Sequence, residues 1–236
     1  MLETAGQVTQ RLNRFGLRLV VREEIRPVLY LLLMAILAGT WKWWNAWTFA
    51  AVLQVTTIVY HVILVKKNPE VLNARGTRQQ GTKTVDKWLL GTMALLGLAV
   101  PVIAALEVGE AGWTAPLWML TAGVALVVCG MVGITWSMAV NRHFEVTVRI
   151  QQDRQHRVIT GGPYAYLRHP GYAFGLLAVI GCPLVLGSSW AMLATACLTV
   201  VLVVRTAFED RTLQKELEGY RDYKVKVRWR LVPGVW

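Results

Sequence analysis

Apolar residues run in six long blocks along this chain, separated by short polar segments. The blocks cover residues 27–41, 46–65, 88–106, 115–140, 172–186 and 190–204. Most approach the ~20 residues that an α-helix needs to cross the hydrocarbon core of a bilayer. The first block is short, but the polar residues before it can extend its helix. The last two blocks predict a tilted hairpin around the turn Gly187-Ser188-Ser189. The pattern predicts an all-α, polytopic membrane bundle of about 5–6 transmembrane helices.

The composition supports a membrane protein and argues against a soluble one. Hydrophobic residues make up 55% of the 236 residues and charged residues only 17%, which is less charge than a soluble domain carries. A net charge of +11 suggests nucleic acid as a partner, but its distribution does not. Of 25 Lys and Arg, 24 precede residue 27, lie in 66–87 or 141–171, or follow residue 204. We therefore predict membrane lipids as partners, no nucleic acid, and both termini in the cytoplasm.

The chain shows no internal repeat and no low-complexity linker, so it predicts one membrane domain over residues 1–236. Residues 1–140 form a four-helix part, and residues 141–236 hold most of the polar chemistry. The segment 66–87 is interpreted as a solvated connector near the lipid headgroups. The three cysteines lie inside apolar blocks, where we expect small buried hydrophobes. They show no metal-ligand spacing, so no metal site is predicted.

The segment 161–172 is the strongest candidate for a binding site. It combines Arg168 and His169 with three tyrosines, directly before an apolar block. Pro170 disfavours helix at the preceding residue and suits the first turn of the next helix. Arg168 and His169 then lie at a helix N-terminus, a place suited to an anionic group. Snorkelling to lipid phosphates is the alternative, but it leaves Tyr164, Tyr166 and Tyr172 unexplained, whereas aromatic faces suit a planar or cationic ligand.

Two further polar clusters are expected at the same membrane depth. His156 precedes the turn at Gly161 by a short β-like stretch, so its side chain can fold back toward the site. Arg205 and Glu209 are four residues apart at the end of the last apolar block, and therefore share one helix face. An i,i+4 ion pair on an interfacial helix is the simpler interpretation. Two polar clusters at one depth favour a pocket on the cytosolic side.

The residues of this region resemble a known family. Gly162-Pro163-Tyr164, Arg168-His169-Pro170 and Tyr172 are similar to the G-P-Y-x-x-x-R-H-P-x-Y motif of the isoprenylcysteine carboxyl methyltransferase family, which belongs to a wider group with membrane phospholipid methyltransferases. The tail continues the likeness over roughly residues 130–236. The matching tail positions are Arg205, Glu209, Asp210, Leu213, Leu217, Tyr220, Tyr223, Arg230 and Pro233. Asp210 departs from the pattern, because the family often has a second Glu there.

The resemblance implies S-adenosylmethionine-dependent transfer of a methyl group to a lipophilic acceptor that enters from the bilayer. It suggests the carboxylate of a prenylated cysteine as acceptor. It implies that Arg205 and Glu209 are catalytic. The residues that it implies for binding the methyl donor are His156, Gly162, Tyr164, Arg168, His169, Tyr172 and Glu209.

Other interpretations remain open at this stage. Membrane sterol-type reductases that use NADPH share a similar R-H-P-x-Y segment, although they usually have more spans. A non-catalytic membrane scaffold would leave the polar clusters unexplained. The acceptor is also open between a prenylcysteine, a small thiol, a phospholipid amine and another lipid acid. A carboxylate acceptor needs no base, whereas a thiol or amine would need Glu209 or His169 to take a proton. The sequence does not indicate an oligomeric state.

Overall fold

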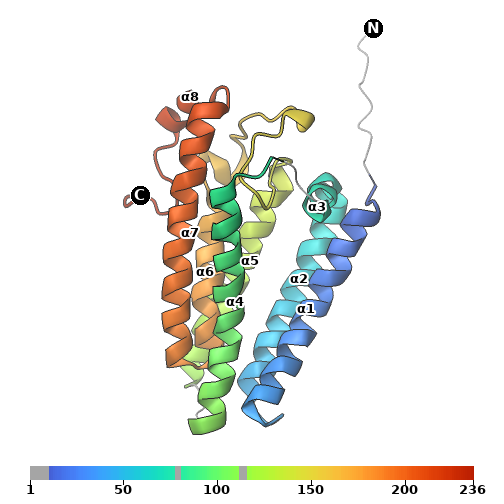
Figure 1. The fold of residues 1–236 in the computed structure, drawn as a ribbon, viewed down its shortest axis with the longest axis vertical. Helices are drawn as coiled ribbons and strands as arrows, with labels where there is room; N and C mark the ends of the chain where they lie inside the picture. The colour runs from blue at the N-terminus through green and yellow to red at the C-terminus, as the bar shows by residue number, and fades with distance from the viewer. Residues whose placement is uncertain (1–10, 78–80, 112–115) are drawn as a thin grey trace.

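The computed structural model describes residues 11–77, 81–111 and 116–236, all folded into helices and connecting segments without a strand (Figure 1). Two single-turn 3-10 helices, η1 (Gln152–Arg154) and η2 (Gly162–Ala165), lie in the long connection after the fifth helix. The α-helices are α1 (Arg14–Ala38), α2 (Trp44–Lys67), α3 (Pro69–Gly76), α4 (Thr84–Ala111), α5 (Leu117–Val140), α6 (Pro170–Leu186), α7 (Ser189–Glu216) and α8 (Tyr220–Lys226).

The predicted membrane bundle is confirmed. Helices α2, α4, α5 and α7 are long and apolar enough to span a bilayer, and α6 is a shorter apolar helix. Helix α1 begins at Arg14, where the Asn13 side chain accepts hydrogen bonds from the N–H groups of Phe15 and Gly16. The polar residues before Pro27 therefore do extend the first apolar block into a helix of 25 residues. The chain is an integral, multi-pass membrane protein.

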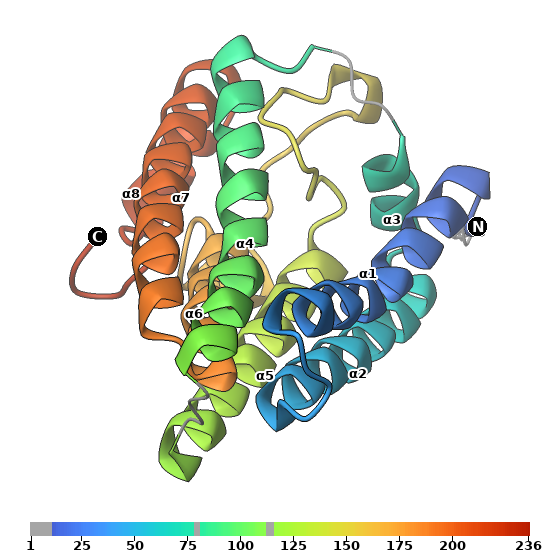
Figure 2. The ribbon, with the colours of Figure 1, turned by 60° about the horizontal axis from the view of Figure 1, so that its bottom comes forward.

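The helices form two groups, which contact each other through α5 and also where α1 packs against α4. Helices α1 and α2 lie side by side with α3 at one end, whereas α4, α6 and α7 form the other group (Figures 1 and 2). Glycines allow α5 and α6 to approach closely: a Cβ on Gly130 would lie 2.6 Å from the backbone nitrogen of Ala178, and one on Gly181 would lie 2.7 Å from the Gly123 carbonyl. Such small-residue contacts hold membrane helices together without a hydrophobic driving force.

The predicted hairpin between the last two apolar blocks is present. Gly187 ends α6 with a φ of 71°, and the Ser188 side chain accepts a hydrogen bond from the Ala191 N–H at the start of α7. Glu107 of α4 accepts hydrogen bonds from the backbone N–H groups of Ser189 and Trp190. Donors left free by the start of α7 thus find an acceptor on a neighbouring helix.

Three sequence interpretations change. The segment 66–87 contains α3 and the buried Asp86, so it is more than a solvated connector. Cys129 and Cys197 are exposed on the bundle rather than buried. Residues 158–160 form no strand. Residues 78–80 of the segment 66–87, and residue 115 at the start of the fourth apolar block, lie outside the described residues.

The polar connection after α5, the helix α8 and the chain end gather at one end of the bundle (Figure 1). The backbone N–H groups of Arg168 and His169 donate hydrogen bonds to the carbonyls of Trp229 and Arg230 at 2.9 and 3.1 Å. Tyr220 and Tyr223 of α8 form a small buried apolar cluster with the flanking residues Leu217 and Val227. The tail thereby positions the segment 161–172 for a site.

Candidate active site

Two hollows meet at the polar end of the bundle. The polar cavity, of about 780 Å³ including its open mouth, is lined by the connection after α5, the start of α6 and the ends of α7 and α8. The membrane cleft, of about 1580 Å³ including its open side, is lined by residues of α1 to α7. Phe144, Glu145, Gly171 and Tyr172 line both. They mark the junction between a polar compartment and a largely apolar one.

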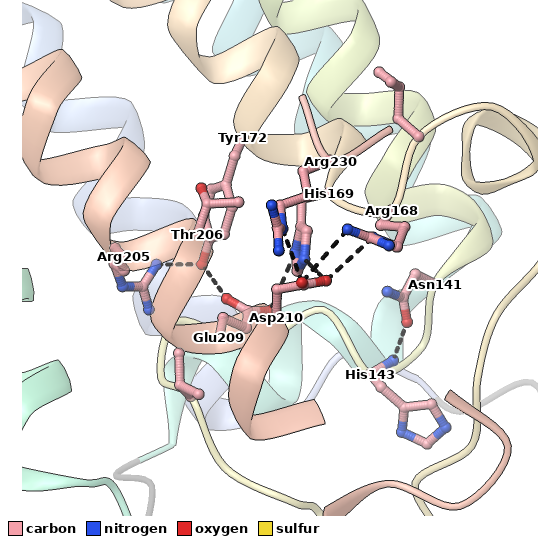
Figure 3. Close-up of polar contacts among 12 residues, drawn as sticks. Asn141, His143, Arg168, His169, Tyr172, Arg205, Thr206, Glu209, Asp210 and Arg230 are labelled. Atoms are coloured by element: carbon pink, nitrogen blue, oxygen red, sulfur yellow. Dashed lines mark hydrogen bonds and ion pairs between the residues drawn. The ribbon is translucent and has the colours of Figure 1, made fainter. Parts of the chain in front are cut away.

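Tyr172 lies at this junction between the two predicted catalytic residues (Figure 3). Its hydroxyl donates a hydrogen bond to the Glu209 carboxylate and accepts one from the Arg205 guanidinium. Glu209 lines the polar cavity and Arg205 lines the membrane cleft. The side chain of Glu209 keeps 25% of its surface exposed, so it retains capacity to contact a ligand. The three side chains connect the compartments.

Asp86 holds Arg205 in place, and sequence reasoning missed it. The Asp86 side chain is fully buried, and its Oδ1 accepts a hydrogen bond from Arg205 Nε at 2.8 Å. Its Oδ2 accepts one from the Val148 N–H at 2.7 Å. A further Arg205 nitrogen donates to the Val146 carbonyl. In the sequence Asp86 is a single acidic residue just before an apolar block, and only the fold brings it next to α7.

Asp210 is the centre of a buried polar hub (Figure 3). The carboxylate is fully buried and forms ion pairs with Arg168 at 3.1 Å and Arg230 at 2.8 Å. It also accepts hydrogen bonds from Tyr220 at 2.9 Å and Gln214 at 2.7 Å, and His169 Nε2 lies 3.3 Å away. Buried charges of this kind require such compensation. The charges of Arg168 and Arg230 are therefore used inside the protein, although Arg168 and His169 still line the cavity.

Tyr164 forms part of the cavity wall. Its hydroxyl accepts a hydrogen bond from the Asn141 side chain at 2.9 Å, and its carbonyl accepts one from Tyr223 at 2.7 Å. Burial raises the pKa of the Tyr164 hydroxyl above its ordinary value. Gly162, with a φ of 59°, allows the turn that places Tyr164. Tyr166 is exposed and does not line the cavity.

Two histidine rings lie against each other in the cavity wall, tilted by 36°. The rings of His143 and His156 lie 4.7 Å apart, and both line the cavity. Burial lowers the pKa of His143, and burial together with the neighbouring His143 lowers the pKa of His156 to about 4. Both rings are thus neutral at physiological pH. His143 Nε2 is buried and has no hydrogen-bond partner within the described part of the chain. It is a polar group without a partner on a residue that lines the cavity, and it was not predicted.

Ion pairs fasten the connection after α5 to the bundle. Arg154 pairs with Glu70 of α3 at 2.8 Å and with Glu145 at 3.4 Å. Arg149 pairs with Glu145 at 2.8 Å and with Asp153 at 2.7 Å. Glu145 itself is almost fully buried between these two arginines. The network fixes one rim of the polar cavity.

The predicted donor-binding residues thus fall into two groups. Those that line the polar cavity are His156, Tyr164, Arg168, His169, Tyr172 and Glu209. Gly162 is not among the lining residues; it lies behind the wall, where a Cβ would approach Trp136 and Val140 within 3.3 Å. Arg205 lines the cleft and reaches the cavity through Tyr172. The fold brings the two polar clusters together, as expected for one site.

Comparisons with known proteins agree with this geometry. Residues 118–218 match the family model described as phospholipid methyltransferase. The chain is 27% identical over 193 residues to a protein of Oryza sativa subsp. indica named probable protein-S-isoprenylcysteine O-methyltransferase, covering 78% of this chain and 93% of the rice protein. A protein with the same name from Oryza sativa subsp. japonica matches to the same extent.

A solved structure shares the fold. The eukaryotic intramembrane Ras methyltransferase, isoprenylcysteine carboxyl methyltransferase, superposes with a TM-score of 0.61 at 18% identity, covering 88% of this chain and 73% of that one. The family match covers α5 to α7, which carry the junction residues Tyr172, Arg205 and Glu209. In sequence this chain is therefore similar to phospholipid methyltransferases and to proteins named protein-S-isoprenylcysteine O-methyltransferase, and it shares the fold of an isoprenylcysteine carboxyl methyltransferase.

Proposed function

We propose that this protein transfers a methyl group from S-adenosylmethionine to a lipophilic acceptor, with the carboxylate of a prenylated cysteine as the acceptor group. The observation that carries the proposal is the junction of a polar cavity with a membrane cleft at Tyr172. A water-soluble donor fits the first compartment and an apolar acceptor fits the second. The names of the rice relatives and of the solved structure support the acceptor class.

The residues of the polar cavity fit the methyl donor. Its sulfonium is a cation, and the partly exposed Glu209 carboxylate and the Tyr172 ring are groups that attract one. The unpartnered Nε2 of the neutral His143 offers a hydrogen-bond acceptor or donor to a nucleoside. We assign donor binding to His156, Tyr164, Tyr172 and Glu209, with Arg168 and His169 holding the cavity wall. Gly162 acts by shaping the turn before Tyr164.

Bound S-adenosylmethionine supplies an activated methyl group, which passes to the acceptor oxygen while the S–CH₃ bonding pair stays on sulfur. The protein has to align the two partners, and alignment accounts for up to about 7–11 kcal/mol of such a barrier. In our proposal Tyr172 separates the compartments and sets the approach, held by Arg205 and Glu209. A carboxylate acceptor arrives deprotonated, so neither Glu209 nor His169 has to remove a proton.

The proposal also covers the orientation of the protein in the membrane and its domain organisation. Nearly all Lys and Arg lie at the end of the bundle that carries the polar cavity or in its connections, which supports a cytoplasmic active site and cytoplasmic termini. We propose that residues 1–236 work as one membrane domain. In it residues 1–140 supply most of the cleft, and residues 141–236 supply the donor cavity and the catalytic pair.

Ligand binding by the purified protein tests the proposal. In detergent, S-adenosylhomocysteine should bind and NADPH should not, as measured by isothermal titration calorimetry. Glu209→Gln should then lower methylation of S-farnesyl-N-acetylcysteine at least tenfold, whereas Glu218→Gln, an exposed carboxylate on the same chain end, should leave it unchanged. Binding of NADPH alone would favour a reductase, and binding of neither ligand a scaffold.

A further inference from the structure

The lining of the membrane cleft is largely apolar but contains five charged groups. Three are the guanidinium groups of Arg26, Arg75 and Arg205, and two are the carboxylates of Glu23 and Glu145. Glu145 pairs with Arg149 and Arg154, which do not line the cleft. Ionisable groups inside a membrane bundle are costly; they face the interior, pair with other groups and mark the paths of substrates. The partners of the three arginines therefore show which positive charge is left for a ligand.

Arg75 is the cleft arginine that no carboxylate contacts directly. The Glu23 carboxylate acts on both Arg26 and Arg75, so one negative charge faces two guanidinium groups, and the Arg75 side chain also hydrogen-bonds Tyr60. Arg205 is paired with Asp86 at 2.8 Å, and Arg26 with Glu23 at 3.5 Å. No ion pair joins Arg75 to any acidic residue in the ranges that the structure describes, and its Nε is buried without a hydrogen-bond acceptor. A buried guanidinium N–H that lacks an acceptor is destabilising. An anionic ligand in the cleft would supply that acceptor.

Only the ring of Phe144 lies between Arg75 and the junction of the two compartments. Its Cζ lies 5.9 Å from the ring centroid of Phe144, which lines both the cleft and the polar cavity. The same ring packs on Gly171, where a Cβ would come within 2.4 Å of it. Gly171 directly precedes Tyr172. An anion bound by Arg75 would therefore lie next to the place where donor and acceptor meet.

We propose that Arg75 binds the carboxylate of the acceptor, and that the acceptor is a long-chain amphiphilic acid. The proposal rests on the proposed function, since it takes the membrane cleft as the acceptor site. A planar guanidinium matches a carboxylate with two parallel hydrogen bonds. The apolar chain of the acid would lie along Leu53, Val100 and Leu198, which line the deeper cleft. A neutral thiol or amine acceptor would provide no negative charge to pair with Arg75.

The test compares an acid with its uncharged isostere. S-farnesyl-N-acetylcysteine and its carboxamide are titrated into the protein in phosphatidylcholine nanodiscs saturated with S-adenosylhomocysteine. A charge-assisted hydrogen bond corresponds to about ten- to a hundredfold in affinity. Wild type should therefore bind the acid at least tenfold more tightly than the amide, and Arg75→Gln should bring the ratio close to one. Arg75→Lys, which keeps the charge but not the fork, should retain an intermediate ratio.

Controls separate this inference from the proposed function and from misfolding. Arg26→Gln removes a cleft guanidinium that pairs with Glu23 and leaves Arg75 in place, so the acid should still bind more tightly than the amide. S-adenosylhomocysteine should bind every variant, because Arg75 and Arg26 do not line the polar cavity. Failure of wild type to bind it would refute the proposed function. Normal binding with equal affinity for acid and amide, as expected if Arg75 holds a lipid phosphate, would overturn the role of Arg75 alone.

Discussion

The buried pair between Asp86 and Arg205 gives the sharpest prediction about the catalytic end of the bundle. Asp86 offers two acceptor oxygens, one to Arg205 and one to the Val148 N–H. Asn in its place has one acceptor and one NH₂ group, so one of those two donors loses its partner. Asp86→Asn also leaves the charge of Arg205 buried without its counterion.

The structure sets the size of this effect. Both side chains are almost completely buried, at 0% and 4% exposure, so water cannot replace the lost partner. Removing one member of a buried ion pair costs about 3–5 kcal/mol. Because Arg205 also contacts the Tyr172 hydroxyl, its displacement should disturb the junction. A displacement on the order of 1 Å at a reacting centre can lower the rate about a hundredfold. We therefore expect both a loss of stability and a much lower turnover.

A double-mutant cycle in detergent micelles measures the pair. Asp86→Asn, Arg205→Gln and the double variant are compared by chemical denaturation and by methylation rate. The double variant should be more stable than the sum of the single losses, since it contains no unpaired buried charge. Asp153→Asn is the matched control, because Asp153 pairs with Arg149 at an exposed position, where an ion pair contributes about 0–1 kcal/mol. Additive losses within about 0.5 kcal/mol would refute the reasoning.

Three further predictions concern the walls of the polar cavity. Gly171→Ala should lower both the melting temperature and the affinity for S-adenosylhomocysteine in calorimetry, because its Cβ would collide with the Phe144 ring, whereas Gly175→Ala on the same helix meets open space and should be neutral or stabilising. The pKa of His156, about 4 against 6.5 in the unfolded chain, means that the unfolded chain binds the extra proton. Stability should therefore be complete above pH 6.5 and fall toward pH 4 in thermal unfolding, and His156→Gln should flatten that slope. Asp210→Glu adds one methylene to a fully buried hub and should cost about 1–3 kcal/mol in denaturation, whereas Asp210→Asn removes the charge that balances Arg168 and Arg230 and should cost more.

The sequence predicted most reliably those features that depend only on residues close together in the chain. Apolar block lengths predicted the spans, and the start of α6 at Pro170 followed from the missing N–H of proline. The spacing of Arg205 and Glu209 placed them on one face, where Tyr172 now joins them. Such features depend on a few neighbouring residues along one helix, so pattern alone reveals them.

Contacts between segments that are far apart in the chain could not be predicted from the sequence. Asp86 meets Arg205 across 119 residues and His143 meets His156 across a folded connection, and no local pattern distinguishes these side chains from solvated ones. The Gly171-x-x-x-Gly175 spacing is typical of a helix-packing face, yet a Cβ on Gly171 would meet the Phe144 ring and one on Gly175 would meet no atom within 4 Å. The close helix contact is instead made by Gly123, Gly130 and Gly181, whose role depends on how α5 crosses α6.

Charge pairing separates residues that hold the site from residues that are free to act in it. Arg168 and Arg230 share the single carboxylate of Asp210, and Arg205 pairs with Asp86. A motif rich in Arg and His therefore does not by itself form an anion site, because its guanidinium groups form ion pairs inside the protein. The groups left with capacity are Glu209 on the cavity side, the Nε2 of His143 above it, and Arg75 on the cleft side. An anion beside Arg75 and a cation beside Glu209 would meet across Tyr172, which is the charge arrangement that transfer from a sulfonium to a carboxylate requires.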